Sequence, residues 1–395
     1  MAEYSGTSAI DWARLIATTI SDHIRDEEST WMKSYQMLAL LEANNRLTYN
    51  HAGRGFDWPV EYRAHQIYGN TGETTRTFAR RNKWKTAQLP YHRGYTVDDA
   101  ISNGELLANR GEAAIVNLTN NFVTRLEKSI KHGMSTEIYV DGNATGNETS
   151  WHGFFSMFNT NGTTTITSGA QRSANAADVV GYPSDTYAGL TTGLGDYGGE
   201  DGDAVWPLGA CDPEFDFWSP LVVNPLSTNA AAFPSSTDTW AGAADEVLRY
   251  SILQSQRNQS MNGGLTNFFL NRESYGAFLN LIDNKEQIRI TRGEGQGLIS
   301  LGFRNVVEFD GVEVSWEAGV PSVTPSTYTN ASKTLRGFGF NFNNVEYRSM
   351  HSTLLDSEGP FYDEDTQQHK YVASTLGNLK FESPRNLVAI VELSG

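Results

Sequence analysis

Apolar positions near the start of the chain recur at helical spacing. Within residues 8–47 they form two short sets, around 10–20 and 31–41, with a polar run between them. Each set is short and one-sided, and helices of this kind are marginal in water without a partner surface. We therefore expect an N-terminal arm of helical pieces that packs on its own body or on a neighbouring molecule.

The pattern changes between residues 54 and 95, where helical spacing stops and Gly, Thr and Arg become frequent. The segment Gly69-Asn70-Thr71-Gly72 is typical of a turn between two polar arms. These features predict a long two-stranded ribbon. Because a lone two-stranded ribbon is marginal in water, we expect docking elsewhere to stabilise it.

A long helix is predicted after the ribbon. Asp98 and Asp99 offer N-cap chemistry, and Gly133 offers a left-handed C-cap. A short strand is expected at 137–140, followed by a glycine turn at 141–146. The apolar stripe of the helix consists of Ile115, Leu118, Phe122, Leu126 and Ile130.

The next stretch, up to about residue 238, is rich in Gly, Ser, Thr and Asn and shows little periodicity. So long an irregular stretch in a compact protein is usually functional or an elaborated surface insertion. Regular patterns then return with a helix at 240–252, and with a buried strand at 268–270 that Asn271 caps into another helix.

The last quarter of the chain is predicted to be mainly strand. Asp310-Gly311 between two apolar runs is a strong signal for a β-hairpin. Helices and strands thus occur in mixed order, which indicates an α+β protein. The expected strands are 306–309, 312–316, 335–342, 345–348 and 378–392.

Composition excludes several classes of protein. The chain has 395 residues, of which 9 are Trp, 17 Tyr and 19 Phe, so it can build substantial cores and is not disordered throughout. The single cysteine, Cys211, excludes an intramolecular disulfide framework and Cys-based zinc or iron–sulfur sites. We find no secretory signal and no run of the ~20 apolar residues needed to cross a bilayer. A protein without membrane contact, kept on the cytoplasmic side, is expected.

Charge is unevenly distributed along the chain, whose net charge is −16. Residues 54–93 carry eight basic and three acidic side chains, a net +5, whereas the rest carries 22 basic and 43 acidic side chains, a net −21. A nucleic-acid site with Phe78, Trp84 and Tyr91 interleaved is one interpretation, but the acidic body would repel phosphate over a Debye length of ~10 Å. A solvated loop is another. We favour a basic arm that lies on the acidic body of another copy.

No motif for catalysis is present. The chain lacks a phosphate-binding loop and a Gly-x-Ser-x-Gly elbow, and its eight histidines never fall at the spacing of a zinc protease. We therefore expect no catalytic residue, no cofactor and no resident metal.

Two further clusters have weak alternative interpretations. A group of acids among glycines could hold Ca²⁺, but it lacks the ligand order of an EF-hand, and solvated acids are the better interpretation. These acids are Asp196, Glu200, Asp201 and Asp203. Four tryptophans could stack on sugars and keep a carbohydrate-binding or carbohydrate-active surface protein open as the alternative function, although most tryptophans belong to cores. They are Trp58, Trp151, Trp206 and Trp218.

The order of these pieces resembles the major capsid proteins of tailed double-stranded DNA bacteriophages, which have the Hong Kong 97-type shell fold. The ribbon at 55–95 and the helix at 98–132 are similar to the extended loop and spine helix of that family. Residues 137–146, with Trp151-His152-Gly153-Phe154-Phe155 after them, resemble the strand and glycine turn that follow the spine helix.

The C-terminal half carries the rest of the resemblance. Residues 267–281 and the hairpin at 306–316 are similar to the strand, helix and hairpin of the axial domain. Residues 377–385 are similar to the closing strand. The stretch 156–238 is longer and more aromatic than the family's pattern and is interpreted as an insertion.

The resemblance implies a division of the chain into six parts. They are an N-terminal arm (1–53), an extended β-ribbon loop (54–96), the spine helix with the start of the peripheral domain (97–155), the insertion (156–238), the axial domain (239–344), and a return through the peripheral domain to the closing strand (345–395).

The function implied by the resemblance is that of a major capsid protein without enzymatic activity. Many copies, as hexamers and pentamers, would assemble into the icosahedral shell around a double-stranded DNA genome, without sequence-specific DNA binding. A portal protein and scaffolding or decoration proteins would be its other partners. The protein would reside in the virion capsid, and in the host cytoplasm during assembly.

The ribbon is expected to contact a neighbouring subunit, with an aromatic anchor supplying most of the affinity and ion pairs of ~0.2–1 kcal/mol each setting the approach. Some relatives join a ribbon lysine to a neighbour's asparagine, but we expect no such crosslink here. We also expect no fused scaffold segment before the arm, because the ribbon begins near residue 54. The predicted contact residues are Arg76, Phe78, Arg80, Arg81, Lys83, Trp84 and Lys85.

Overall fold

The structure of this protein is a computed structural model, and its described residues divide into two compact units. Unit 1 contains residues 95–133 and 355–375, and unit 2 contains 34–94, 134–354 and 376–395. Most of the predicted N-terminal arm lies outside the described residues. The described ranges are 36–63, 82–91, 93–108, 118–158, 166–168, 180–183, 185–200, 212–223, 239–257, 264–285, 306–321 and 333–393.

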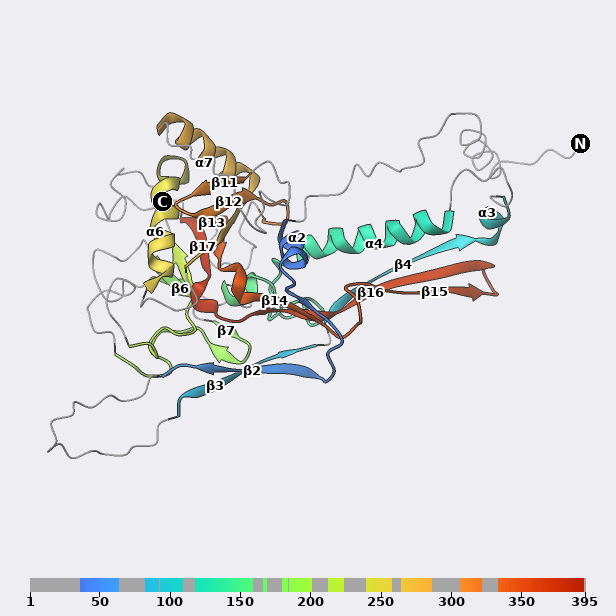
Figure 1. Ribbon diagram of the computed structural model, residues 1–395, viewed down its shortest axis with the longest axis horizontal. Coiled ribbons are helices and arrows are strands. Elements are labelled where there is room, and N and C mark those ends of the chain that lie inside the picture. Colours follow the sequence, from blue (N-terminus) through green and yellow to red (C-terminus); the bar gives the residue numbers. More distant parts are fainter. Residues whose placement is uncertain are drawn as a thin grey trace, which may run out of the picture. The chain divides into compact units, whose positions relative to one another are not determined.

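The centre of unit 2 is an eight-stranded mixed sheet with the strand order β11-β12-β10-β13-β17-β9-β6-β5 (Figure 1). Two of its neighbouring pairs, β10 with β12 and β17 with β9, are parallel, and the other printed pairs are antiparallel. The strands are β5 (Ile166–Ser168), β6 (Val180–Pro183), β9 (Leu221–Val223), β10 (Asn267–Leu270), β11 (Val306–Phe309), β12 (Val312–Trp316), β13 (Lys333–Phe340) and β17 (Val388–Leu393).

Two helices, α6 (Trp240–Ser255) and α7 (Arg272–Lys285), pack on this sheet. Their apolar faces and the inner sheet residues form one buried cluster, which includes Leu248, Phe268 and Phe278. Burial of large apolar side chains is the main stabilising term in such a core. Both helices were predicted from apolar spacing, and the structure confirms them.

Local sequence signals in unit 2 are also confirmed. The Asn271 Oδ1 accepts a hydrogen bond of 2.8 Å from the backbone N–H of Ser274, as a helix N-cap does. Asp310 and Gly311 have φ angles of 49° and 81°, which a tight two-residue turn between antiparallel strands requires.

A second sheet has the strand order β1-β14-β16-β15, and β4 also pairs with β16. In unit 2, β1 runs parallel to β14, and β14 is antiparallel to residues 377–381 of β16. In unit 1, β15 is antiparallel to residues 368–374 of β16. The strands are β1 (Leu47–Thr48), β4 (Gly94–Ser102), β14 (Val345–Ser349), β15 (Asp356–Asp363) and β16 (Gln368–Phe381).

Shorter elements complete the described chain. The strands β7 and β8 form a small hairpin, and helix α2 confirms the helical pattern predicted for the described end of the arm. These elements are α2 (Gln36–Ala43), α3 (Asn103–Ala108), α4 (Leu118–Glu137), α5 (Phe155–Phe158), β7 (Thr186–Tyr187), β8 (Leu190–Thr191), η3 (Phe342–Asn344) and η4 (Pro384–Asn386).

The predicted N-cap at Asp98 and Asp99 is wrong, because both residues lie in strand β4. Pairing with β16 overrides the local capping preference. The helical segment begins at Asn103 instead, and the Ser102 hydroxyl accepts a 3.2 Å hydrogen bond from the N–H of Glu105. Ser102 and Glu105 have the spacing of a capping box, which is the local signal for this helix start.

The predicted helix end at Gly133 and the strand at 137–140 are also wrong. Helix α4 continues to Glu137, and turns follow it. The reason is that Met134 and Ile138 continue the four-residue spacing of Leu126 and Ile130, and all four side chains are buried. Residues 109–117 of the predicted helix lie outside the described residues.

The described end of 156–238, the stretch interpreted as an insertion, contributes a strand to the central sheet. Strand β9 lies between β17 and β6 in the eight-stranded sheet, and its three residues are buried. Phe215 and Trp218 are buried just before it. Three consecutive apolar residues carry no periodicity that distinguishes a buried strand, which is why the pattern did not reveal it.

Candidate functional site

The predicted ribbon is present at its base, where β2 (Gly55–Glu61) pairs antiparallel with β3 (Trp84–Pro90) from Gly55 opposite Pro90 to Glu61 opposite Trp84. A further backbone hydrogen bond of 3.0 Å joins Tyr62 N–H to the Lys83 carbonyl. The turn predicted at 69–72 lies outside the described residues. The two faces of the ribbon differ sharply in burial.

The inner face of the ribbon base is part of the apolar core of unit 2. Phe56, Trp58, Ala87 and Leu89 point to this side and are buried. The rings of Trp58 and Trp218 lie 6.5 Å apart, between centroids. The surface that stabilises the base of the ribbon is therefore the body of its own subunit.

Backbone hydrogen bonds also hold the base. The N–H of Gln88 donates to the Ala188 carbonyl at 2.9 Å, which joins β3 to the hairpin of β7 and β8. The Asn378 side chain donates to the Pro90 carbonyl at 2.9 Å, which joins the same strand to β16. These bonds, together with the aromatic contacts, fix the direction in which the two strands leave the body.

Cationic side chains from the second sheet cover the inner face. The Arg348 guanidinium lies 5.3 Å from the Phe56 ring centroid, and the Lys380 ammonium lies 5.1 Å from that of Trp58. Such cation–π contacts are favourable by ~0.5–2 kcal/mol, most when desolvated. They place two positive charges against the aromatic layer of the ribbon.

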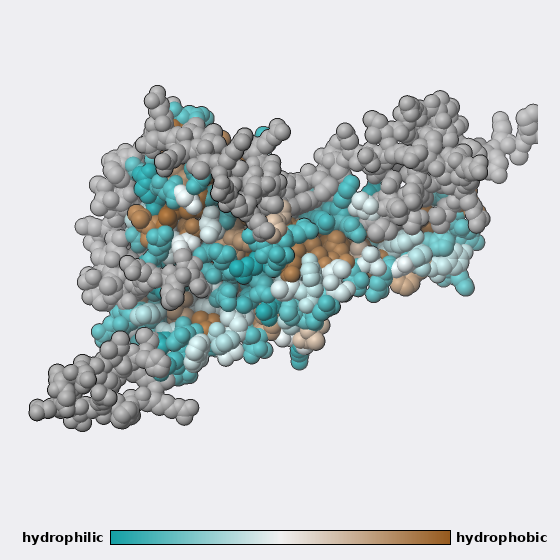
Figure 2. Space-filling view, viewed as in Figure 1, coloured by the Kyte–Doolittle hydropathy of each residue, from teal (hydrophilic) through white to brown (hydrophobic). Residues whose placement is uncertain are grey.

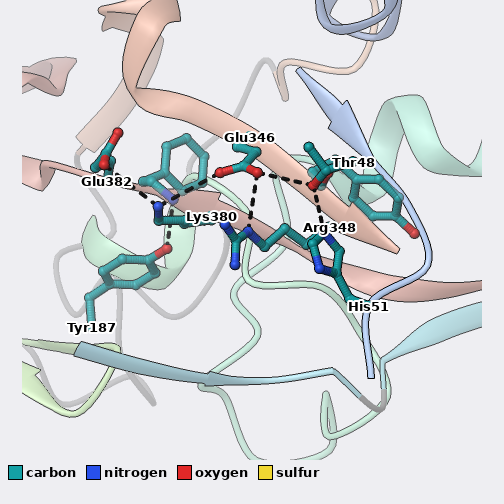
Figure 3. A network of polar contacts seen from close by, with 9 residues as sticks. Thr48, His51, Tyr187, Glu346, Arg348, Lys380 and Glu382 are labelled. Atoms are coloured by element: carbon teal, nitrogen blue, oxygen red, sulfur yellow. Dashed lines mark hydrogen bonds and ion pairs between the residues drawn. The ribbon is translucent and has the colours of Figure 1, made fainter. Parts of the chain in front are cut away.

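Glu346 balances both cations (Figure 3). One carboxylate oxygen lies 3.1 Å from Arg348 Nε, and the other lies 3.7 Å from Lys380 Nζ. Thr48 donates to Glu346 at 3.0 Å, and His51 Nε2 lies 3.0 Å from the Thr48 hydroxyl oxygen. The network thus connects three strands to the segment that leads into the ribbon.

His51 stacks on Tyr91, with 5.9 Å between ring centroids and 12° between ring planes. Burial lowers the pKa of His51, and the Arg348 charge acts in the same direction, while Glu346 opposes them. The imidazole is therefore held toward its neutral form. Its place beside Tyr91, just after β3, makes it a structural support of the ribbon.

At the outer end of the base, charged side chains from both strands have partners on their own subunit. The Arg63 guanidinium forms an ion pair with Glu214. The Lys85 ammonium lies 5.6 Å from the Tyr62 ring centroid and 5.1 Å from that of Tyr197. Lys85, one of the predicted inter-subunit contact residues, thus lies against two aromatic rings of its own subunit.

Trp84 differs from all these residues, because its side chain is 54% exposed. It is the first residue of β3 and lies opposite Glu61. The outer face of the base is otherwise polar or small, with Asp57, Thr86 and Gln88 exposed. The other predicted contact residues, Arg76, Phe78, Arg80 and Arg81, lie outside the described residues.

The support residues Arg348, Lys380 and Glu346 were not identified from the sequence. Arg348 and Lys380 lie 292 and 322 positions after the rings that they contact, those of Phe56 and Trp58, so no local pattern brings them together. The alternation of Phe56 and Trp58 with Asp57 and Pro59 was a usable signal, since period two marks a strand with one buried face.

The alternative chemistry receives no support from the described residues. Trp58, Trp151 and Trp218 are buried, so they present no surface for stacking on sugars. No three His, Cys, Asp or Glu side chains gather as metal ligands within the described ranges. Of the acids predicted as possible Ca²⁺ ligands, Asp196 accepts a hydrogen bond from Thr191 and Glu200 is exposed. Residues 201–211 lie outside the described residues.

None of the described helices has the length and apolar content needed to span a bilayer.

Comparison with known proteins gives matches in structure alone. No protein-family model and no curated protein matches the sequence. The capsid asymmetric unit of Cyanophage A-1(L) is similar over 96% of this chain and 98% of that chain, with a TM-score of 0.57 and 12% identity. The capsid of a native GTA particle is similar over 100% of both chains, with a TM-score of 0.54 and 11% identity.

A third capsid structure, from the Cyanophage P-SCSP1u, has a TM-score of 0.50 and 12% identity, and covers 99% of this chain and 96% of that chain. At these identities the likeness shows the fold. The predicted α+β class and the predicted capsid-type fold are confirmed: the chain has, over nearly its whole length, the fold of phage capsid proteins.

Proposed function

We propose that this chain is a major capsid protein, a structural subunit of which many copies form the icosahedral shell around a double-stranded DNA phage genome. The likeness to three capsid structures from end to end supports this function. The protein acts through its contacts and has no enzymatic role.

The observation that carries the proposal, beside the fold, is the construction of the ribbon. Its base is fixed to the body by buried aromatics and cation–π contacts, while the exposed Trp84 stands where the described strands end. A rigid base fixes the direction in which the rest of the ribbon leaves the body of the subunit. A subunit that must contact neighbours at fixed positions in a shell needs this property.

The six-part division made from the sequence is retained as part of the proposal. Residues 1–53 act as the arm, 54–96 as the extended loop, 97–155 as the spine helix with the start of the peripheral domain, 156–238 as a Gly-, Ser- and Thr-rich insertion, 239–344 as the axial domain and 345–395 as the return through the peripheral domain to the closing strand. The partners are further copies in hexamers and pentamers, with a portal protein and scaffolding or decoration proteins. The site of action is the virion, after assembly in the host cytoplasm.

Electron microscopy of the expressed chain tests this function. The full chain, expressed alone and with the proteins encoded beside it, is purified by size and imaged in negative stain. Closed hollow shells of uniform diameter support the proposal. A uniform monomer under every condition, with or without those proteins, contradicts it.

A further inference from the structure

Glu317 follows strand β12 and is a buried carboxyl group without a compensating cation. Its side chain is 1% exposed, and no cation of the described residues forms an ion pair with it. The buried carboxylate of Asp216, in contrast, contacts two arginines. One oxygen of Glu317, Oε2, accepts from the Tyr139 hydroxyl at 2.9 Å, whereas Oε1 is buried without a hydrogen bond to any described residue. This site suits the uncharged acid, because an ionised carboxylate needs donors for both of its oxygens.

Three segments of unit 2 meet at this carboxyl group. Tyr139 lies just after α4, and Met37, whose backbone N–H acts on Glu317, lies in the first turn of α2. Figure 1 shows α2 beside the C-terminal end of α4. The turn after Glu317 packs closely on that end, since a Cβ atom at Gly319 would lie 2.1 Å from the Ser135 carbonyl oxygen. Glu317 therefore lies where α2 meets the rest of unit 2.

Apolar burial and one polar contact also hold α2. The Ser315 hydroxyl donates to Gln36 Oε1 at 2.6 Å, and the buried apolar side chains of the helix include Met37, Leu40 and Leu41. Figure 2 shows hydrophobic residues at the surface near the middle of the displayed face, where Figure 1 places α2. A helix of 8 residues is marginal in water by itself. Its contacts with unit 2 therefore decide whether α2 is docked.

We propose that Glu317 is a proton-dependent switch for α2, which stays docked on unit 2 while the carboxyl group holds its proton and detaches when the proton is lost. The proton passes to water, no other bond is made or broken, and the detached state lets water solvate the carboxylate. Because α2 is the described end of the predicted N-terminal arm, this switch controls the release of the arm from its own subunit. It is a property of the free subunit and does not depend on the proposed capsid function.

The direction of the switch follows from the groups that act on Glu317. Burial raises its pKa from 4.5 to about 8, while Tyr139 and the Met37 backbone lower it by smaller amounts. Among the described residues, Tyr139 is the titratable side chain that acts on it, and it stays neutral because burial and the charge of Glu317 raise its own pKa well above 10. The other charged side chains on the surrounding elements, which are not among the groups that shift the pKa of Glu317, are Glu42, Glu137, Glu313 and Arg336.

Detachment exposes Glu317 to water, where its pKa returns to its ordinary value of 4.5. The docked state holds the proton more tightly, so its advantage over the detached state is complete below pH 4.5. Between pH 4.5 and about 8, the ratio of detached to docked α2 rises by roughly tenfold for each pH unit, and above about pH 8 it is constant. The switch thus acts across the neutral range.

Hydrogen–deuterium exchange of the full-length, unassembled chain tests the switch. Exchange is measured from about pH 5 to about pH 9 and corrected for the intrinsic rate of each amide. The protection of amides within α2 is expected to fall by roughly tenfold for each pH unit up to about pH 8 and to stay constant above it. At every pH, amides of α2 should exchange faster than those of α6, because α2 detaches without unfolding the sheet.

Three variants assign the effect to its groups. Glu317→Gln keeps an acceptor for Tyr139 but cannot ionise, so the protection of α2 is expected to be independent of pH. Tyr139→Phe removes a group that favours the ionised form, so the loss of protection is expected to extend to higher pH before it levels off. The matched control Glu308→Gln removes a partly exposed carboxylate of β11 and is expected to behave like the unaltered chain.

Three results would overturn the proposal. If the protection of α2 in the unaltered chain does not change with pH, Glu317 is a structural contact and not a switch. If amides of α2 and α6 are equally protected at every pH, α2 is released only when the whole of unit 2 unfolds. A pH profile that Glu317→Gln leaves unchanged would assign the titration to another group. None of these results bears on the proposed capsid function, because electron microscopy assesses shell formation separately.

Discussion

The ammonium of Lys380 lies 5.1 Å from the ring centroid of Trp58, so a strand of the second sheet holds the first strand of the ribbon. Lys380 is buried and is compensated by Glu346 at 3.7 Å and Glu382 at 3.6 Å. Trp58 in turn contacts Trp218. The ribbon base is therefore as much a part of the folding core as the sheet beneath it.

Replacing Trp58 by alanine is predicted to destabilise the isolated subunit. Trp58 is only 7% exposed, and truncating a buried tryptophan costs ~3–5 kcal/mol. The matched control is Trp84→Ala, which removes the same ring from a side chain that is 54% exposed and is expected to change the free energy of unfolding by less than ~1 kcal/mol. Urea denaturation, followed by tryptophan fluorescence, compares the two. An equal loss of unfolding free energy in Trp58→Ala and Trp84→Ala would show that Trp58 does not anchor the ribbon base.

For assembly, the exposed ring of Trp84 is expected to matter more than the charge of its neighbour Lys83. Trp84→Ala leaves the subunit folded and is expected to lower the yield of particles more than Lys83→Ala does, because an aromatic anchor contributes more affinity than an exposed ion pair. Light scattering during assembly measures the rate. A Lys83→Ala defect larger than that of Trp84→Ala is the contrary outcome.

Salt should act on the approach of subunits more than on the finished shell. Charge between the ribbon and its acceptor surface steers association, and added salt screens it over a Debye length of ~3 Å at 1 M. Assembly is therefore expected to slow between low and high salt, while preformed particles keep their sedimentation coefficient. If high salt dissociates preformed particles as strongly as it slows assembly, charge would also supply the free energy that stabilises the finished shell, contrary to this prediction.

A buried ion pair secures the segment before β9. Asp216 accepts from Arg257 Nε at 2.6 Å and lies 3.1 Å from Arg385, and the side chains of Asp216 and Arg257 are 0% and 3% exposed. Arg257→Met is expected to cost ~3–5 kcal/mol, since it leaves a buried charge with fewer partners. The control Arg249→Met breaks an exposed pair with Asp310 and should cost ~0–1 kcal/mol. Similar unfolding midpoints for the two variants would contradict the claim that the buried ion pair of Asp216 stabilises the fold.

Glu317 makes the stability of the fold depend on pH. The side chain is fully enclosed and accepts a hydrogen bond of 2.9 Å from the Tyr139 hydroxyl. Burial raises its pKa from 4.5 to about 8, against the smaller opposing effects of hydrogen bonds from Tyr139 and the Met37 backbone. The folded state therefore holds the proton more tightly than the unfolded chain. Its contribution to stability is complete below pH 4.5 and is lost as the pH rises to about 8.

The variant Glu317→Gln removes this titration. It is expected to gain stability relative to the unaltered chain as the pH rises from 5 to 8, by ~1.4 kcal/mol for each pH unit in the steepest part. Urea midpoints at several pH values measure the difference. Glu308→Gln, on a partly exposed position of β11, is the matched control for the loss of a carboxylate. A constant difference between Glu317→Gln and the unaltered chain across that range would show that Glu317 does not titrate there.

The parts of the fold that were predicted correctly have strong local signals. Asp310-Gly311 takes the positive φ angles that its turn demands, and Asn271 caps its helix, because both effects act within four residues. The failures have a common cause in distant partners. Asp98 and Asp99 lie in a strand because β16 is available to pair with β4, and α4 passes Gly133 because buried residues continue its stripe.

For the candidate site, the sequence located the ribbon but not its support. The charge contrast of 54–93 and the loss of helical spacing were visible without a structure. The burial of Phe56 and Trp58 under Arg348 and Lys380 was not, because those cations lie almost 300 or more positions further along the chain. Local patterns show that a segment is a ribbon, whereas only tertiary packing shows which of its faces is free.

The mass of the purified assembly tests the central claim, that this chain is a shell subunit, most directly. Sedimentation velocity or mass photometry of the full chain, at concentrations and with partner proteins that permit assembly, is expected to show one narrow species whose mass is a large multiple of 43.6 kDa and lies in the megadalton range. A Trp84→Ala sample run in parallel is expected to shift material from that species to free subunits. A single species of 43.6 kDa or a small closed oligomer, under all these conditions, would contradict the account.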